Sequence, residues 1–236
     1  MARNTGGLAI VIPAVDEAAT IAATLERLAP IRSRGALVIV VDGGSSDATA
    51  VRAAPHADRV LQSERGRALQ MNAGASAALA AGDINTLLFL HADTELPADA
   101  DRLIRRALHT PVRVWGRFNV RIDGSSAMLR VVTAMMNWRS RLTGICTGDQ
   151  AIFVTSAAFA RLGGFAPIPL MEDLEFSRRA KKLSRPIVID APVITSGRRW
   201  KRRGVWRTIF LMWRLRLAFY LGADPATLAR DYRDAR

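Results

Sequence analysis

Acidic side chains follow three of the predicted strands, at the point where each strand ends: Asp16 and Glu17, Asp42, and Asp93. In an open α/β sheet, ligands bind beyond the carboxyl ends of the strands, so we expect these carboxylates to meet at one edge. In a basic chain, such an acidic crevice indicates a bound cation or a ligand rich in hydroxyl and amide donors. Asp42 or Asp16 could accept hydrogen bonds from a ribose or a base.

Two further features point to a phosphate ligand. Mg²⁺ that bridges two phosphates needs only one or two carboxylates, because it keeps several waters, and Asp93 is placed for that role. Gly66 lies between Arg65 and Arg67, where backbone and guanidinium groups could approach a phosphate. The chain has neither P-loop spacing nor a G-x-G-x-x-G after the first strand, which weighs against an ATPase and a Rossmann dehydrogenase.

The elements that would position these residues alternate between strand-like and helical patterns, which is typical of βαβ units and a mostly parallel sheet. The first half predicts strands over residues 8–12, 36–41, 59–61 and 86–90, and helices over 20–28 and 68–81. In the second half, residues 112–122 alternate like an exposed strand. Helical spacing then predicts a helix packed into the core by Met128, Val131, Val132, Met135, Trp138 and Leu142.

Composition and charge bound the class of protein. The 236 residues are 50% hydrophobic and 23% charged, the balance of a folded chain with a substantial core. The formal net charge of +13 suggests a polyanionic partner, such as nucleic acid, anionic lipid or a phosphorylated substrate. This charge is local, because residues 198–236 hold 11 basic and three acidic residues and so contribute +8.

The basic tail predicts an amphipathic helix with an apolar stripe of Trp206, Ile209, Phe210, Trp213, Leu217 and Tyr220. Aromatic side chains beside arginines fit an interfacial helix on an anionic membrane. Docking on the protein's own core and a homo-oligomer contact remain alternatives. We therefore expect one domain over residues 1–200 and a basic C-terminal helical extension over 201–236.

A cytoplasmic protein is expected from the remaining signals. Cys146 is the single cysteine, which excludes an internal disulfide and a thiolate metal cluster and favours a reducing compartment. The apolar run at residues 8–12 is too short for a signal peptide, and no run reaches the roughly 18 uncharged apolar residues of a membrane span. The tail could still bring the protein to the inner face of the membrane.

Five segments resemble, in order and spacing, the motifs of family 2 glycosyltransferases of the GT-A fold: residues 11–17, 41–49, 89–94, 148–150 and 171–175. The resemblance spans residues 8–200. It implies a Rossmann-like, mostly parallel central sheet flanked by helices. It also implies an inverting enzyme that moves a sugar from a nucleotide-diphosphate donor to an acceptor hydroxyl, with Mg²⁺ or Mn²⁺.

The resemblance implies roles at the donor side. It assigns to the nucleotide pocket Pro13, Asp16, Glu17 and Asp42. Asp93 would be the last acid of the D-x-D-like metal motif, with His91 in the place of the first acid. A histidine at that position could ligate the metal, donate to a phosphate, or pack.

The resemblance also implies the catalytic base. Asp173, with Glu172 before it, matches the carboxylate that takes the proton from the attacking acceptor hydroxyl. Without the resemblance, both acids could simply stabilise a helix N-terminus. The acceptor and diphosphate side would be formed by Gly148, Asp149, Gln150, Arg199 and Trp200. The preceding residues depart from the full Q-x-x-R-W motif of processive members, which argues against a polymerising activity.

Several choices stay open. Residues 90–94 and 172–179 look most like a small bacterial subgroup that is often named for arsenosugar biosynthesis. A nucleotidyltransferase would share the nucleotide and metal but attack phosphorus and release pyrophosphate. A non-catalytic nucleic-acid-binding protein would explain the charge, but the chain has no nucleic-acid motif and its ligand edge is acidic. The sugar, the base and the acceptor, which could be lipid-linked, are not readable.

Overall fold

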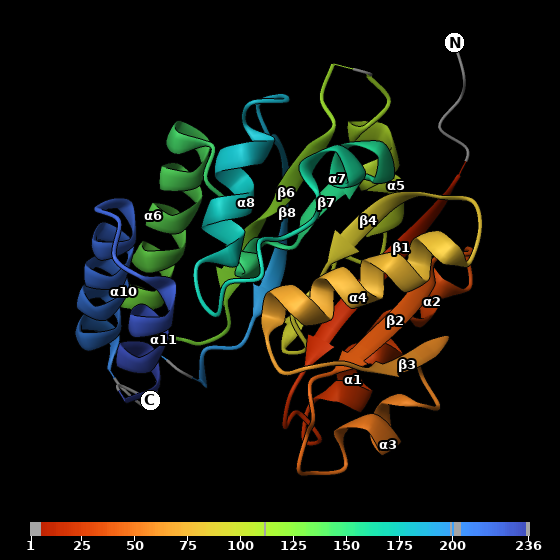
Figure 1. Ribbon diagram of the computed structural model, residues 1–236, viewed down its shortest axis with the longest axis horizontal. Coiled ribbons are helices and arrows are strands. Elements are labelled where there is room, and N and C mark those ends of the chain that lie inside the picture. The colour runs from red at the N-terminus through yellow and green to blue at the C-terminus, as the bar shows by residue number, and fades with distance from the viewer. Residues whose placement is uncertain (1–5, 111, 199, 201–203, 235–236) are drawn as a thin grey trace.

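The computed structural model describes residues 6–110, 112–198, 200 and 204–234. Within these ranges, eight strands form one sheet in the order β3-β2-β1-β4-β7-β6-β8-β5, with helices packed around it (Figure 1). The strands are β1 (Gly7–Ala14), β2 (Leu37–Asp42), β3 (Arg59–Gln62), β4 (Ile84–Phe89), β5 (Thr94–Glu95), β6 (Trp115–Ile122), β7 (Ile152–Thr155) and β8 (Ile187–Thr195). The helices are α1 (Ile21–Arg27), α2 (Ala29–Arg32), α3 (Thr49–Ala53), α4 (Arg67–Ala80), α5 (Ala100–Ala107), α6 (Ala127–Thr143), η1 (Gly148–Gln150), α7 (Ser156–Leu162), α8 (Glu172–Ala180), α10 (Val205–Tyr220) and α11 (Pro225–Asp234).

The sheet divides into two parts that meet between β4 and β7. Strands β3, β2, β1 and β4 are parallel, as expected of βαβ units. Strand β7 pairs antiparallel with β4 and with β6, and β6 pairs parallel with β8. The predicted α/β class with a mostly parallel central sheet is confirmed.

Strand β1 lies in the middle of the core and contributes to both faces, because successive side chains of a strand point to opposite sides. Ile10 and Ile12 belong to the cluster that includes α1, α2 and α5, whereas Ala9 and Val11 belong to the cluster with α4, α7 and α8. A Cβ atom at Gly74 of α4 would lie 2.4 Å from a methyl group of Val11. The missing side chain therefore lets α4 approach the sheet closely.

The prediction of an exposed strand at residues 112–122 is wrong. Strand β6 begins at Trp115 and is mostly buried, and Arg117 in its middle has no exposed surface. The burial is possible because the Arg117 guanidinium donates hydrogen bonds to Asn119 Oδ1 (2.6 Å) and to the Asn137 carbonyl (3.1 Å). The charged residue that made the strand look exposed is solvated by amide oxygens inside the protein.

The prediction that the methionine-rich stripe packs into the core is also wrong. Val132 is buried, but Val131, Met135, Trp138 and Leu142 are between 49% and 64% exposed. The inward-facing side of α6 carries a different set of apolar residues. It packs against Val205 and Ile209 of α10 through Leu129, Val132 and Met136. The stripe is therefore a solvent-facing apolar surface of α6.

Helix α10 docks through the side opposite to its aromatic stripe. Leu215 is fully buried and shares a cluster with Leu174 of α8 and Leu228 of α11. The members of the predicted stripe that stay 50–65% exposed are Trp206, Phe210, Trp213, Leu217 and Tyr220, while Ile209 packs inward. In the described part of the chain, no helix is both long and apolar enough to cross a membrane.

Candidate active site

The predicted acidic edge lies where β1, β2 and β4 end. Asp42 is the last residue of β2, Asp16 and Glu17 follow β1, and Asp93 follows β4. Pro13 lies beside Val41 of the neighbouring strand and leads the chain into this edge. The structure divides the acids into two groups, each held by its own partners.

Asp16 and Asp42 enclose the turn that follows β2. The Asp16 carboxylate accepts hydrogen bonds from the Ser46 backbone N–H (2.7 Å) and from Arg65 (3.2 Å). Asp42 is buried and accepts from the Ser45 backbone N–H (3.1 Å) and the Ser45 hydroxyl. The backbone N–H and hydroxyl of Ser46 lower the pKa of Asp16, so this turn is bordered by a charged carboxylate.

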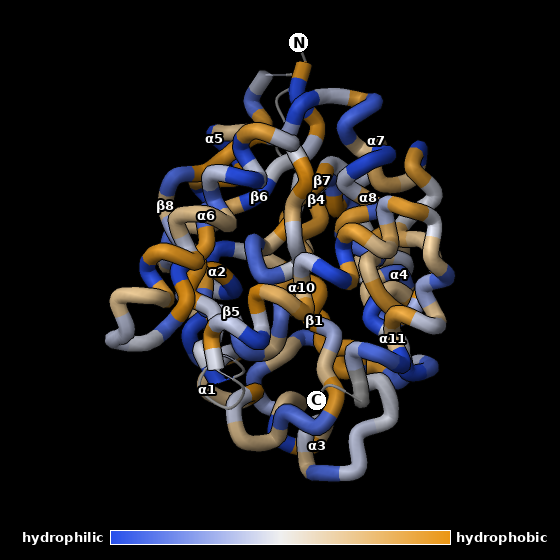
Figure 2. Tube along the Cα trace, turned by 90° about the vertical axis from the view of Figure 1, so that its left-hand side faces the viewer, coloured by the Kyte–Doolittle hydropathy of each residue, from blue (hydrophilic) through white to orange (hydrophobic). Residues whose placement is uncertain are grey.

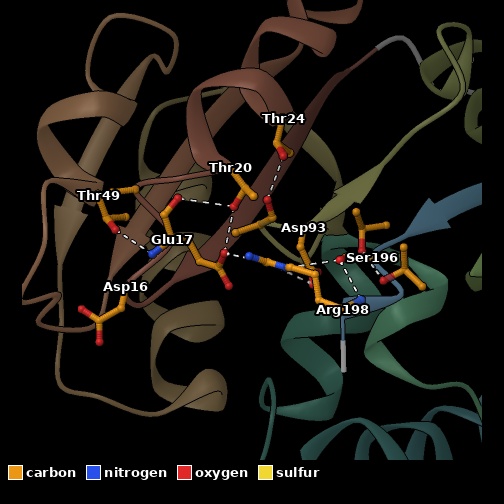
Figure 3. Close-up of polar contacts among 12 residues, drawn as sticks. Asp16, Glu17, Thr20, Thr24, Thr49, Asp93, Ser196 and Arg198 are labelled. Carbon is orange, nitrogen blue, oxygen red and sulfur yellow. Dashed lines mark hydrogen bonds and ion pairs between the residues drawn. The ribbon is translucent and has the colours of Figure 1, made fainter. Parts of the chain in front are cut away.

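Glu17 and Asp93 form the second group, and Arg198 joins them (Figure 3). The Arg198 guanidinium lies 3.1 Å from Glu17 Oε2 and 3.8 Å from Asp93 Oδ2. Its Nε donates to the Ser196 hydroxyl at 3.2 Å, and Glu17 also accepts from the Thr20 hydroxyl at 2.8 Å. Sequence reasoning missed Arg198, because one arginine in a basic run carries no signal of its partners.

Asp93 is the carboxylate best placed to bind a metal ion. Burial raises its pKa, as do the nearby carboxylates, while His91 and Arg198 oppose the shift. The described residues contain no cluster of three or more side chains that could hold a metal by themselves. One partly desolvated carboxylate fits Mg²⁺ or Mn²⁺ that takes its other ligands from a diphosphate and water.

His91 contacts Asp149, which follows it by 58 positions in the chain. Its Nδ1 lies 3.2 Å from Asp149 Oδ1. Its Nε2 is buried, has no hydrogen-bond partner among the described residues, and would lie 2.3 Å from a Cβ atom at Gly148. The imidazole therefore packs against a backbone that only glycine permits, and connects the end of β4 to η1.

The second half of the site is built around Asp173, in the first turn of α8. Asp173 Oδ2 accepts from the Gly148 backbone N–H and Oδ1 accepts from the Leu174 backbone N–H, each at 2.8 Å. A small cavity beside it is lined by Arg67, Phe89, His91, Gly148, Glu172 and Asp173. The structure thus brings Asp173 and Gly148 together with His91 from the acidic edge.

The other residues expected on the acceptor side have different surroundings. Gln150 is buried, and its side chain accepts from the Thr147 backbone (3.2 Å) and donates to Asn137 (3.4 Å). Trp200 packs against the cluster of Ile122, Leu129 and Val132. Arg199 lies outside the described residues.

An ion pair between an exposed arginine and a buried glutamate connects α8 to the start of α4. Arg67 Nη1, at the start of α4, lies 3.3 Å from Glu172 Oε1, and the Glu172 side chain is 3% exposed. Burial raises the pKa of Glu172; Asp173 adds to the increase, and Arg67 opposes it. Arg65 and Arg67, expected near a phosphate, are thus paired with Asp16 and Glu172, on either side of Gly66.

The family model described as glycosyl transferase family 2 matches residues 9–162. The chain belongs to this family. The predicted family is therefore confirmed, and with it the expectation of a glycosyltransferase over a nucleotidyltransferase or a nucleic-acid-binding protein. The narrower subgroup resemblance stays a prediction. A comparison with curated proteins finds no match.

Solved glycosyltransferase structures share the fold. Glucosyl-3-phosphoglycerate synthase from Mycobacterium tuberculosis, in complex with Mn²⁺, UDP and phosphoglyceric acid, has 17% sequence identity and a TM-score of 0.57, over 80% of this chain and 70% of its own. Mannosyltransferase PcManGT from Pyrobaculum calidifontis, in complex with GDP-Man and Mn²⁺, has 19% identity and a TM-score of 0.61, over 91% of this chain and 61% of its own. Residues 1–349 of S. aureus TarS have 16% identity and a TM-score of 0.61, over 81% of this chain and 60% of that structure. The predicted GT-A fold is confirmed, and the chain spans less than two thirds of the last two structures.

Replacing Arg67 by glutamine will leave Glu172 buried without its cation. We expect a loss of about 1–3 kcal/mol in the free energy of unfolding at pH 8, because an unpaired buried charge is costly. The folded-state pKa of Glu172 is already raised and will rise further. The free energy of unfolding therefore falls as the pH rises through that pKa. The difference in this free energy between Arg67→Gln and the wild type shrinks when the pH is lowered toward the pKa of an ordinary glutamate.

Urea denaturation at several pH values measures this effect. Arg65→Gln is the matched control, because Arg65 pairs with the exposed Asp16 and such a pair contributes at most about 1 kcal/mol. Equal deficits for the two variants, or a deficit of Arg67→Gln that does not change with pH, would contradict the assignment.

Proposed function

We propose that the protein is an inverting glycosyltransferase that moves a sugar from a nucleotide-diphosphate donor to an acceptor hydroxyl, with Asp173 as the general base. The observation that carries this proposal is the double backbone contact of Asp173, from Gly148 and Leu174, beside a cavity that borders the acidic edge. A base must keep a fixed direction toward the proton that it removes. Two N–H groups from different elements supply that fixed direction.

The donor would lie along the carboxyl ends of β1, β2 and β4. Asp42 and Asp16, with Pro13 at the base of the pocket, would accept hydrogen bonds from the base and ribose. The diphosphate would lie near Asp93, where Arg198 is close enough to approach a phosphate oxygen. His91 and Asp149 would shape the floor between the diphosphate and Asp173.

The transfer follows from this arrangement. Asp173 takes the proton of the acceptor hydroxyl while the hydroxyl oxygen attacks the anomeric carbon. The bond from that carbon to the diphosphate oxygen breaks, its electron pair leaves with the nucleoside diphosphate, and the configuration of the carbon is inverted. A divalent ion, Mg²⁺ or Mn²⁺, held through Asp93 would stabilise the charge on the departing diphosphate.

Replacing Asp173 by asparagine will abolish most of the transfer, because the amide keeps the shape but cannot accept the proton. We expect the turnover number to fall by about 10²- to 10⁴-fold while binding of the nucleoside diphosphate is retained. The donor is first identified by a thermal-shift screen of nucleotide sugars with Mg²⁺ or Mn²⁺. The rate of nucleoside diphosphate release from that donor then measures turnover.

Glu175→Gln is the control for Asp173→Asn, because Glu175 lies on the same helix and is paired with Arg179. A fully active Asp173→Asn variant would overturn the base assignment. Release of pyrophosphate instead of a nucleoside diphosphate would overturn the proposed reaction.

Replacing Asp93 by asparagine will weaken metal-dependent binding of UDP or GDP by about tenfold or more, since losing even an outer-shell partner of a metal has that effect. Binding without metal should change little. Calorimetric titrations with and without Mn²⁺ measure both quantities. Asp190→Asn serves as a control, because Asp190 is exposed and pairs with Arg141. An unchanged metal dependence in Asp93→Asn would show that the metal binds elsewhere.

We further propose that α6 and α10 rest on an anionic phospholipid surface. The two helices pack together through Val132, Met136, Val205 and Ile209, and both have exposed apolar side chains. Both helices lie on the side of the molecule that faces the viewer in Figure 2. Each helix carries three arginines and no acidic residue. Exposed tryptophans beside arginines match the interface of an anionic bilayer.

The double variant Trp206→Ser/Trp213→Ser will lose membrane binding. We expect its partition onto phosphatidylglycerol-containing vesicles to fall by about tenfold or more, because each buried aromatic side chain contributes about 1.5–3 kcal/mol. Vesicle co-sedimentation measures the partition, with Val51→Ser as a control for an exposed apolar residue on α3. The proposal would be contradicted if the wild-type protein did not bind these vesicles, or if the double variant bound them as tightly as the wild type.

A further inference from the structure

Two arginines lie on the helices that pack beside α8, which carries Asp173. Arg139 belongs to α6 and Arg216 belongs to α10. Their Nε atoms, and Nη2 of Arg139, are buried and have no hydrogen-bond partner among the described residues. Buried donors of this kind are rare in native proteins and usually mark the place of a ligand, an ion or water.

Other buried or half-buried arginines of the fold are supplied with acceptors. Arg117 donates to Asn119 and Asn137, and Arg179 donates to Glu175 at 2.6 Å and to the Gly164 carbonyl at 2.9 Å. Arg117 shows that an arginine can be buried here without an acidic partner, provided that amide oxygens surround it. The Nε of Arg117 is also buried without a partner, but both of its terminal nitrogens donate, whereas Arg139 has a terminal nitrogen, Nη2, that is buried without an acceptor.

The packing of the helices places this pair next to the predicted base. Leu215, the neighbour of Arg216, shares a cluster with Leu174, the neighbour of Asp173. Ser140, the neighbour of Arg139, contacts Cys146, whose backbone N–H donates to Ser177 of α8. Helices α6, α8 and α10 thus lie side by side, as Figure 1 also shows.

The charges of these groups act on one another. Desolvation and the positive charge of Arg216 lower the pKa of Arg139 to about 10, while the negative charge of Asp173 opposes the shift. Arg139 is therefore still protonated at neutral pH. The two guanidinium groups therefore repel one another, and an anion bound beside them would reduce this repulsion.

We propose that Arg139 and Arg216 form an anion subsite for the acceptor, which binds a phosphate or carboxylate group and so directs the acceptor hydroxyl toward Asp173. This inference rests on the proposed function, in which Asp173 is the base. The donor diphosphate is expected at the carboxyl ends of β1 and β4, near Asp93 and Arg198. The two arginines come from α6 and α10 instead, so the anion that they attract belongs to the acceptor.

The expected anion is one that a guanidinium group recognises. Arginine donates through planar, parallel N–H groups that match two oxygens of a phosphate or carboxylate. Such an anion would provide acceptors for the buried nitrogens and reduce the repulsion between the two cations. It could come from a small soluble acceptor or from the headgroup of a lipid, since α10 also carries the apolar stripe.

Calorimetric titration of inorganic phosphate tests the subsite in the complete chain. The protein is first saturated with Mg²⁺ and with UDP or GDP, whichever it binds, so that the donor diphosphate site is closed to the probe. We expect the wild-type protein to bind phosphate, and Arg139→Gln and Arg216→Gln each to weaken it by about tenfold or more, the effect of a lost charge-assisted contact. Arg139→Lys should recover part of the affinity.

The matched controls are Arg141→Gln and Arg214→Gln, one on each helix, whose arginines are paired with Asp190 and Asp231. They should keep phosphate affinity within about twofold, because neither removes a donor from the subsite. Thermal midpoints and nucleoside diphosphate affinity are measured for every variant. Phosphate binding that is absent in the wild type, or that is equal in all variants, would overturn the subsite.

A vesicle arm separates the two sources of the anion. If the anion is a lipid phosphate, Arg139→Gln and Arg216→Gln will reduce binding to phosphatidic acid vesicles more than to phosphatidylglycerol vesicles of equal charge. If it is soluble, both vesicle types will bind the variants and the wild type equally, and only free phosphate will discriminate. Failure to bind any nucleoside diphosphate would instead count against the proposed function, and leaves the phosphate comparison intact.

Discussion

The position of one carboxylate depends on two backbone N–H groups that come from different parts of the chain. Gly148 belongs to the short η1 turn before β7, and Leu174 belongs to α8, yet both donate to Asp173 at 2.8 Å. The antiparallel pairing of β7 with β4 brings this turn next to the acidic edge. The Arg67–Glu172 pair then ties the start of α8 to the start of α4. If either contact shifted, Asp173, the proposed base, would lose its fixed relation to the acidic edge.

The parts of this arrangement that depend on short-range patterns could be predicted. Strands β1, β2 and β4 were expected within a few residues of their bounds, because buried parallel strands appear as continuous apolar runs. Their acidic ends follow from the geometry of a parallel sheet. The bridge from Glu17 to Arg198 could not be predicted, since it joins residues 181 positions apart and neither residue carries a signal of the other.

The errors have a common physical cause. Hydrophobic spacing identifies a helix and its apolar side chains, but not the surface that covers them. In α6, Val132 and Met136 pack against α10 while Val131 and Met135 face solvent, although all four are apolar. In α10, Leu211 and Leu215, which lie outside the predicted apolar stripe, are among the side chains that dock. When a helix is apolar on two sides, the spacing of its hydrophobic residues does not show which side packs against the protein and which side faces solvent.

The arginines explain why net charge alone was a poor guide to the ligand. Arg198 lies between two carboxylates, and Arg117 is enclosed by amide and carbonyl oxygens, so these positive charges are already compensated or solvated inside the fold. The donor edge, where a nucleotide would bind, is therefore acidic despite the basic chain. Helices α6 and α10 have six arginines between them and no acid, three from each. Arg141 and Arg214 are paired with Asp190 and Asp231, so the cations of these helices that an anion would stabilise most are Arg139 and Arg216.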